Sequence, residues 1–209
     1  MANFWVFFKI SRVFTVIFAL ISASTSIANV NSIDFRFSLL SALSNNTEAI
    51  EFYEENKFKP IWVGSDRSAR ERSSYFFKEL KNTSKHALPV FRYDANYLKD
   101  QFKKARSATE LGLVEALITL KFLEYSSNLQ TGILKPGSID KEIVRKVPYR
   151  NTSAYLKTLL LVSPKEFFNG IYPQSKQYSV LLSEKTRLEK IISQGGWYSE
   201  LPTELLRPG

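Results

Sequence analysis

FYEENKFKPIWV, residues 52–63, decides the fold of this chain, because it joins the end of an amphipathic helix to a proline and a tryptophan. Phe52 and Tyr53 end a helical turn whose other side carries glutamates. Lys59-Pro60 then disfavours helix, because proline restricts the residue before it to extended backbone. Residues Ile61 to Val63 are therefore predicted to form a short buried strand. We call residues 52–63 the aromatic turn and expect it to hold two elements at a fixed angle.

Helical spacing of apolar residues extends on both sides of the aromatic turn. The strongest pattern covers residues 109–129, whose apolar positions nearly encircle a helix, so we expect this to be the central core helix. Ser107 and Glu110 predict a capping box at its start. The predicted fold is mainly α, an irregular multi-helix domain with one short strand. Helices are expected over residues 34–43, 47–53, 67–81, 94–105, 109–129, 155–162, 165–171 and 178–193, with a loop over 82–93 and a break at Lys135-Pro136-Gly137.

The amino-terminal 28 residues have the layout of a secretory signal peptide. Lys9 and Arg12 precede an apolar stretch, and Ser26-Ile27-Ala28 offers small residues at the cleavage site. A cut after Ala23 is also acceptable. Retention as an uncleaved inner-membrane anchor stays open, although the apolar stretch is shorter than the ~20 residues that span a bilayer. The predicted location is exported and periplasmic.

The remaining chain is predicted to form one domain followed by a tail. A helical domain is expected over residues 29–194, and an extended strap over residues 195–209, ending as if a following domain had been removed. A length of 209 residues with 44% hydrophobic content suits a single ordered core. The net charge of +9 would suit an anionic partner. Basic residues are interspersed with acids and form no long run, so no nucleic-acid surface is predicted.

Four segments, in this order, resemble the amino-terminal scaffold region of the large Gram-negative L,D-transpeptidases. The resemblance covers most of the chain after the leader. Each segment is a weak pattern alone, and the ordered set is moderately specific. The four are FYEENKFKPIWV (52–63), TELGLVEALITLKFLEYSSNLQTGIL (109–134), YLKTLLLVSPKEFFNGIYPQSKQYSVLLSEKTRLEKII (155–192) and GGWYSELPTELLRPG (195–209).

The resemblance implies an exported cell-wall protein whose full-length relatives cross-link peptidoglycan stem peptides by acyl transfer. Those relatives attack with a cysteine in a Ser-His-Gly-Cys context, and their strap leads to a small peptidoglycan-binding module and then the catalytic domain. This chain has no cysteine. Without a thiolate no thioester can form. We therefore expect a non-catalytic scaffold, truncated before the peptidoglycan-binding and catalytic domains. The alternative is a periplasmic peptidoglycan-binding or adaptor module with a basic surface.

No catalytic, cofactor-binding or metal-binding residues are predicted. The only histidine, His86, has no supporting triad motif and is expected to face solvent in a loop. Large aromatic residues beside proline or glycine stops could stack on sugar rings, but such residues more often anchor packing. Expected partners are peptidoglycan or cell-wall proteins, with no nucleic acid, and with membrane contact only through the leader if it is uncleaved. The candidate aromatic residues are Trp62, Trp197, Tyr172 and Tyr178.

Overall fold

The computed structural model describes residues 32–134, 142 and 151–197, and the regular elements in those residues are all helical. The prediction of a mainly α fold is confirmed. The predicted signal peptide, the break at Lys135-Pro136-Gly137 and residues 198–209 of the strap lie outside the described residues. The α-helices are α1 (Ile33–Ala42), α2 (Thr47–Glu55), α3 (Arg67–Lys81), α4 (Ala95–Lys104), α5 (Ala108–Thr131), α7 (Thr152–Leu161), α8 (Pro164–Ile171) and α9 (Lys176–Ser193).

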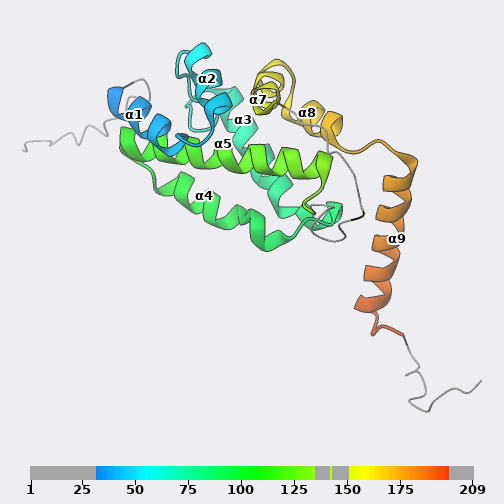
Figure 1. The fold of residues 1–209 in the computed structure, drawn as a ribbon. Helices are drawn as coiled ribbons and strands as arrows, with labels where there is room; N and C mark the ends of the chain where they lie inside the picture. The colour runs from blue at the N-terminus through cyan, green and yellow to red at the C-terminus, as the bar shows by residue number, and fades with distance from the viewer. Residues whose placement is uncertain (1–31, 135–141, 143–150, 198–209) are drawn as a thin grey trace, which may run out of the picture.

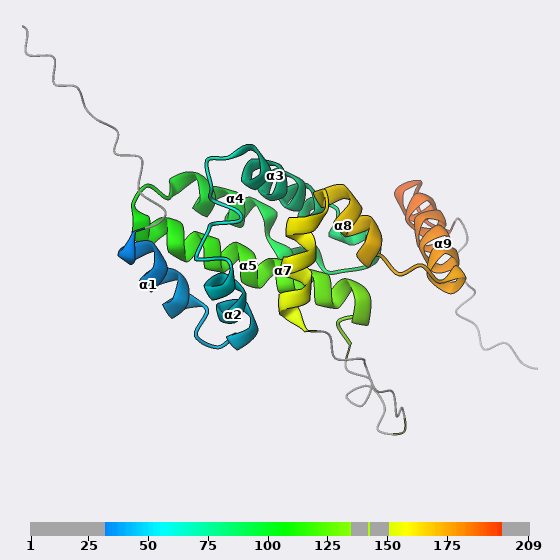
Figure 2. The ribbon, with the colours of Figure 1, turned by 90° about the horizontal axis from the view of Figure 1, so that it is seen from above.

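Helix α5 is the centre of the fold, as its apolar pattern predicted (Figures 1 and 2). Helices α1, α4, α7 and α8 all contact it, and α3 packs against α4 and α8. Buried aromatic rings fill the space between these helices. The Trp62 ring centroid lies 5.2 Å from that of Phe122 and 5.4 Å from that of Phe76. Each such ring removes roughly 150–250 Å² from water, so this cluster is a principal source of stability.

Side-chain caps fix where the helices begin. The predicted capping box at α5 is present: the Glu110 N–H donates to the Ser107 hydroxyl at 3.2 Å, and the Ser107 N–H donates to the Glu110 carboxylate at 2.9 Å. Ser163 and Glu166 form a second box at the start of α8. Each box satisfies backbone donors that have no partner inside the helix, and an N-cap contributes about 1 kcal/mol.

The predicted strand at Ile61 to Val63 is wrong. These residues form bends, and the part of the chain that the structure describes contains no strand for them to pair with. Their backbone N–H groups point instead to a side chain of α5. The sequence pattern could not separate the two outcomes, because a short apolar run after a proline is compatible with any buried, non-helical segment.

The predicted loop over residues 82–93 contains two short 3-10 helices, η1 (Thr83–His86) and η2 (Val90–Tyr93). Ala87, between them, adopts a left-handed conformation with φ of 57°. Single 3-10 turns are too short to produce an apolar period, so apolar spacing could not predict them.

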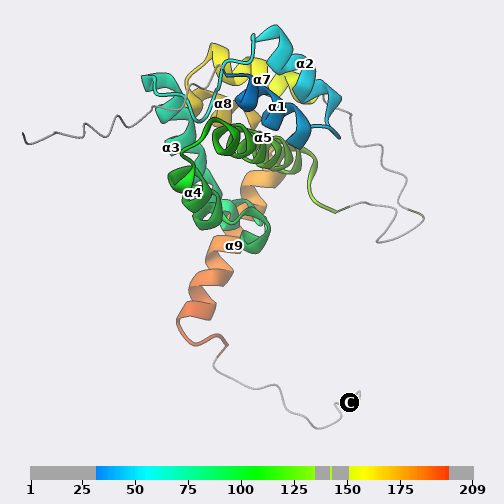
Figure 3. The same ribbon diagram turned by 90° about the vertical axis from the view of Figure 1, so that its left-hand side faces the viewer.

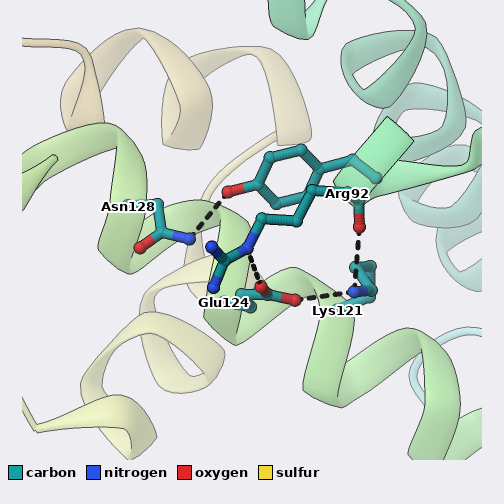
Figure 4. Close-up of polar contacts among 5 residues, drawn as sticks. Arg92, Lys121, Glu124 and Asn128 are labelled. Carbon is teal, nitrogen blue, oxygen red and sulfur yellow. Dashed lines mark hydrogen bonds and ion pairs between the residues drawn. The ribbon is translucent and has the colours of Figure 1, made fainter. Parts of the chain in front are cut away.

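Polar side chains of α5 fix η2 in place (Figure 4). The Arg92 guanidinium lies 2.5 Å from the Glu124 carboxylate. The Lys121 ammonium donates to the same carboxylate at 2.6 Å and to the Arg92 backbone carbonyl at 3.1 Å. The Asn128 amide donates to the Tyr93 hydroxyl at 2.7 Å. Because positions 121, 124 and 128 share one face of a helix, α5 orients this connection along two of its turns.

A glycine lets α1 approach α5 closely. A Cβ at Gly112 would overlap the Phe35 carbonyl oxygen and the Ser38 hydroxyl, and would lie 3.2 Å from the Leu39 nitrogen. Two of these three atoms belong to the backbone of α1. The crossing of the two helices at this separation therefore requires a residue without a side chain.

Helix α9 stands apart from the body of the molecule. It has no buried residue, and Figures 1 and 3 show it projecting beyond α8. Its apolar residues Leu181 and Ile192 are 68% and 62% exposed. The sequence predicted the helix at residues 178–193, but its apolar spacing did not reveal that none of its residues is buried.

Candidate functional site

The aromatic turn is held by one carboxylate, that of Glu115 on α5. Its Oε1 accepts the Ile61 N–H at 2.6 Å and the Tyr53 hydroxyl at 2.7 Å. Its Oε2 accepts the N–H groups of Trp62 and Val63 at 3.1 and 3.0 Å. Four donors from the turn thus converge on one fully buried side chain. We call this arrangement the carboxylate clasp.

Thr119, one helical turn after Glu115, completes the clasp. Its hydroxyl lies 2.7 Å from the Tyr53 hydroxyl and accepts the Trp62 indole N–H at 2.9 Å. Residues four apart on a helix lie on the same face, which places Thr119 beside Glu115. The polar atoms of both aromatic side chains are therefore hydrogen-bonded although both are fully buried.

The backbone entering the clasp is strained. Lys57 and Phe58 have φ angles of 54° and 55°, in the left-handed region that ordinary residues rarely occupy. The Phe58 N–H donates to the Tyr53 carbonyl at 2.7 Å, and the Arg36 guanidinium lies 5.2 Å from the Phe58 ring centroid. Two successive left-handed residues cost roughly 1–2 kcal/mol each. The surrounding contacts must offset this cost.

Burial sets the electrostatics of the clasp. Desolvation raises the pKa of Glu115, although the hydrogen bonds it accepts oppose that rise. Burial also raises the pKa of Tyr53, and the adjacent Glu115 carboxylate adds to the effect. Arg72 supplies a nearby positive charge and donates to the Ile61 carbonyl at 2.8 Å. A carboxylate whose oxygens are occupied and shielded from solvent cannot reach a substrate, so the clasp is structural.

A second polar cluster surrounds His86. Its Nδ1 lies 2.6 Å from the Tyr178 hydroxyl of α9, and its ring stacks on Tyr172 with centroids 4.6 Å apart. The Tyr172 hydroxyl donates to the buried Glu79 carboxylate at 2.6 Å. His86 is thus half-buried, and the predicted solvent-facing position is wrong. Burial, reinforced by the charge of Lys85, lowers the pKa of His86.

The four aromatic residues singled out in the sequence occupy different environments. Trp62 is fully buried in the core and cannot contact a ligand. Tyr172 and Tyr178 both contact the His86 ring, with ring centroids 4.6 and 6.3 Å from the centroid of that ring. Trp197 follows α9 and is 69% exposed. The structure therefore brings Tyr172 and Tyr178 together. Of the four residues, only Trp197 is largely open to solvent.

The described residues contain no group of three His, Cys, Asp or Glu side chains that could hold a metal ion. None of the helices described in the structure has the length and apolarity needed to cross a membrane. The fully buried Glu115 and the half-buried His86 are each hydrogen-bonded to protein partners.

Replacing His86 should loosen α9. In the variant His86→Ala the Tyr178 hydroxyl loses its partner, and both tyrosines lose the stacked ring. We expect a broader distance distribution between spin labels at Lys99→Cys on α4 and Lys190→Cys on α9, measured by pulsed electron paramagnetic resonance. The sequence has no native cysteine, so only these two positions would be labelled. A distribution as narrow as that of the unmodified chain would contradict the anchoring role.

Lowering the pH should loosen α9 as the substitution His86→Ala does. The folded-state pKa of His86 lies below its ordinary value of 6.5, so the stability contributed by the neutral ring is present above that value. It is lost as pH falls through the folded-state pKa. Lys85 opposes protonation, and the Glu79 carboxylate lies beyond Tyr172. The label distribution of the otherwise unmodified chain should broaden as the pH falls below 6.5, while that of His86→Ala should not change with pH.

One comparison with known proteins gave a match. Residues 47–184 match a family described as "Scaffold domain". No curated protein and no solved structure matched the chain. The matched residues run from the start of α2 into α9, so they include the carboxylate clasp and the His86 cluster.

Proposed function

The chain belongs to the Scaffold domain family, and from this premise we propose that it is the non-catalytic scaffold region of an exported, L,D-transpeptidase-like protein of peptidoglycan cross-linking. Its role is positional. It supports α9, and through α9 the segment that follows, at a fixed orientation near the cell wall. The resemblance of four ordered segments to the scaffold region of large L,D-transpeptidases supports the finer assignment.

The carboxylate clasp is the observation that carries this proposal. A single buried carboxylate binds the N–H groups of three consecutive residues, which ties the aromatic turn to the central helix. Hydrogen bonds to charged groups are the strong ones in proteins, at roughly 1.5–3 kcal/mol each. An arrangement that uses a buried charge to fix a turn suits a rigid support, and it leaves no free group for chemistry.

The absence of cross-linking activity is the direct test of the non-catalytic part. The purified chain, incubated with tetrapeptide muropeptides, should give no new cross-linked products by mass spectrometry. A separate L,D-transpeptidase catalytic domain in a parallel reaction shows that the substrates are competent. Cross-links formed by this chain alone would refute the assignment.

The signal-like sequence at residues 1–28 supports export, which is tested separately. In a Gram-negative host the protein should appear in the periplasmic fraction, with Asn29 as its first residue by intact-mass analysis. Recovery with Met1 intact would exclude cleavage and favour an anchored form.

A peptidoglycan-binding or adaptor module is the second candidate function. The net charge of +9 and the exposed Trp197 favour it, since a basic surface attracts anionic polymers. Sedimentation with isolated sacculi separates the candidates. Salt-sensitive pelleting that is reduced in Trp197→Ala favours a binding module, while no pelleting favours a purely positional scaffold.

A further inference from the structure

A pocket of about 580 Å³ lies at the carboxyl end of α5, where that helix meets η1 and the start of α9. Its volume is in the range of small-ligand sites, roughly 300–1,000 Å³. Apolar side chains form much of its wall, and the first two of them are buried. They are Leu88, Leu129, Ile133, Leu134 and Pro173.

No Asp, Glu, Lys or Arg side chain lines this pocket among the described residues. Such side chains make up 23% of the chain, so a pocket without any of them differs from the surrounding surface. His86 lines the pocket, and because its pKa is lowered by burial its ring is neutral at pH 7. Lys85, next to it in the sequence, is exposed and does not line the pocket. The wall of the pocket is therefore uncharged in a chain that is basic as a whole.

Backbone hydrogen-bond acceptors are available at the end of α5. The Gly132 N–H ends the helix by donating to the Asn128 carbonyl. The next three carbonyls, those of Leu129, Gln130 and Thr131, accept no backbone N–H from the described residues. Unpaired carbonyls at a helix end carry its partial negative charge, so they favour a cation or a strong donor.

The Asn128 side chain adds a further acceptor to the same pocket. Its Nδ2 donates to the Tyr93 hydroxyl at 2.7 Å, which orients the amide. Its Oδ1 has no hydrogen-bond partner within the part of the chain that the structure describes. The half-buried Tyr178 lines the opposite end of the sequence range, at the start of α9, and an aromatic ring also attracts a cation.

These features together favour a ligand with one positive charge and an apolar stem. An anion would meet the negative end of α5 and no cation in the pocket wall. A neutral alcohol could pack against the apolar wall, but its hydrogen bonds are weaker than those of a charged donor. A second charge on the ligand would lie against apolar side chains without a partner, which is unfavourable.

We propose that this pocket binds a small organic amine. The ammonium group is held by the free carbonyls at the end of α5 and by the Asn128 Oδ1, and the aliphatic stem packs against Leu88 and Leu129. Since Ser175 and Tyr178 also line the pocket, the bound amine lies between the body of the molecule and the start of α9. The proposal goes beyond the positional role and does not depend on a location at the cell wall.

Three probes with the same five-carbon stem test the charge of the ligand: pentylamine hydrochloride, 1-pentanol and sodium pentanoate. Each is titrated at pH 7 and constant ionic strength into the full ¹⁵N-labelled chain, and amide shifts are followed by nuclear magnetic resonance. Pentylammonium should shift the amides of Leu88, Gly132 and Ile133 to saturation and bind roughly tenfold more tightly than 1-pentanol. Pentanoate should bind more weakly than 1-pentanol. Equal or tighter binding of either comparison probe would overturn the proposal, as would the absence of saturable shifts with pentylammonium.

Two variants with the same change in charge test the place of binding. Leu134→Lys adds a cation at the rim of the pocket, and Leu161→Lys adds one on α7, outside it. Both leucines are exposed, at 67% and 84%, so circular dichroism should show both variants folded. Repulsion at the rim should weaken pentylammonium binding about fivefold in Leu134→Lys, while Leu161→Lys should bind as the unmodified chain does. Equal losses in the two variants would place the amine elsewhere and refute the site.

The outcome is separable from the positional role. If pentylammonium does not bind, the proposed amine site is wrong, yet a narrow α9 label distribution and the absence of cross-linking would still support a scaffold. If the chain forms cross-links while pentylammonium binding persists and is weakened in Leu134→Lys, the non-catalytic assignment fails and the amine site stands.

Discussion

Glu115→Ala should destabilise the fold by at least about 4 kcal/mol in urea unfolding followed by circular dichroism. The substitution removes the acceptor of four buried donors, the Tyr53 hydroxyl and the N–H groups of Ile61, Trp62 and Val63. Each buried donor left without a partner costs roughly 1–3 kcal/mol. Water entering the new cavity would recover only part of this. The loss is a large fraction of the 5–15 kcal/mol by which domains are normally stable.

Two further variants make this result specific to the clasp. Glu115→Gln keeps one acceptor oxygen but turns an amide NH₂ toward backbone N–H donors, so an intermediate loss of about 2 kcal/mol is expected. Glu189→Ala removes an exposed carboxylate on α9 and should change stability by less than about 0.5 kcal/mol. A loss below about 1 kcal/mol in Glu115→Ala would show that the clasp does not hold the turn.

Gly112→Ala should destabilise the fold by about 2 kcal/mol, measured in the same way. Helix propensity alone predicts the opposite sign, since alanine in a helix interior is favoured over glycine by about 1 kcal/mol. The added Cβ would, however, overlap the Phe35 carbonyl and the Ser38 hydroxyl of α1. Backbone atoms cannot rotate away, so α1 would have to shift as a unit, and overpacking of this kind typically costs 1–3 kcal/mol.

A second helical glycine provides the control for this prediction. A Cβ at Gly170, near the end of α8, would meet no atom within 4 Å. Gly170→Ala should therefore leave stability unchanged or raise it by less than about 1 kcal/mol. If Gly112→Ala also stabilised the protein, the close approach of α1 and α5 would be disproved.

The helices could be predicted because their signals are local. A capping box of Ser107 and Glu110 marks the start of helix α5, and apolar residues cover most of the helix circumference. Both features appear in the structure as expected. The observed helix bounds agree with the expected ranges to within three residues. Caps, periodicity and proline or glycine stops act within a few residues of each other, so one sequence is enough to read them.

The clasp could not be predicted, because its parts lie far apart in the sequence. Glu115 accepts hydrogen bonds from residues up to 62 positions away in the sequence. One signal was present: Glu115 is a charged residue among apolar ones on the predicted core helix, at a position where a solvated side chain has no room. A buried acid requires donors, and the aromatic turn contains backbone N–H groups with no helix to accept them. The exposure of α9 likewise depends on tertiary packing, which apolar spacing alone does not reveal.

The clasp also fixes an order of events during synthesis of the chain. The Val63 N–H is made 52 residues before its acceptor, the Glu115 carboxylate. At about 5–20 residues per second, roughly 3–10 s pass before the partner exists. A nascent chain that ends before Glu115 cannot form the native turn, even when the four α-helices before α5 are complete. The native aromatic turn can therefore form only after α5 has been synthesised. Fragments from the first half of the chain should remain unfolded and open to proteolysis.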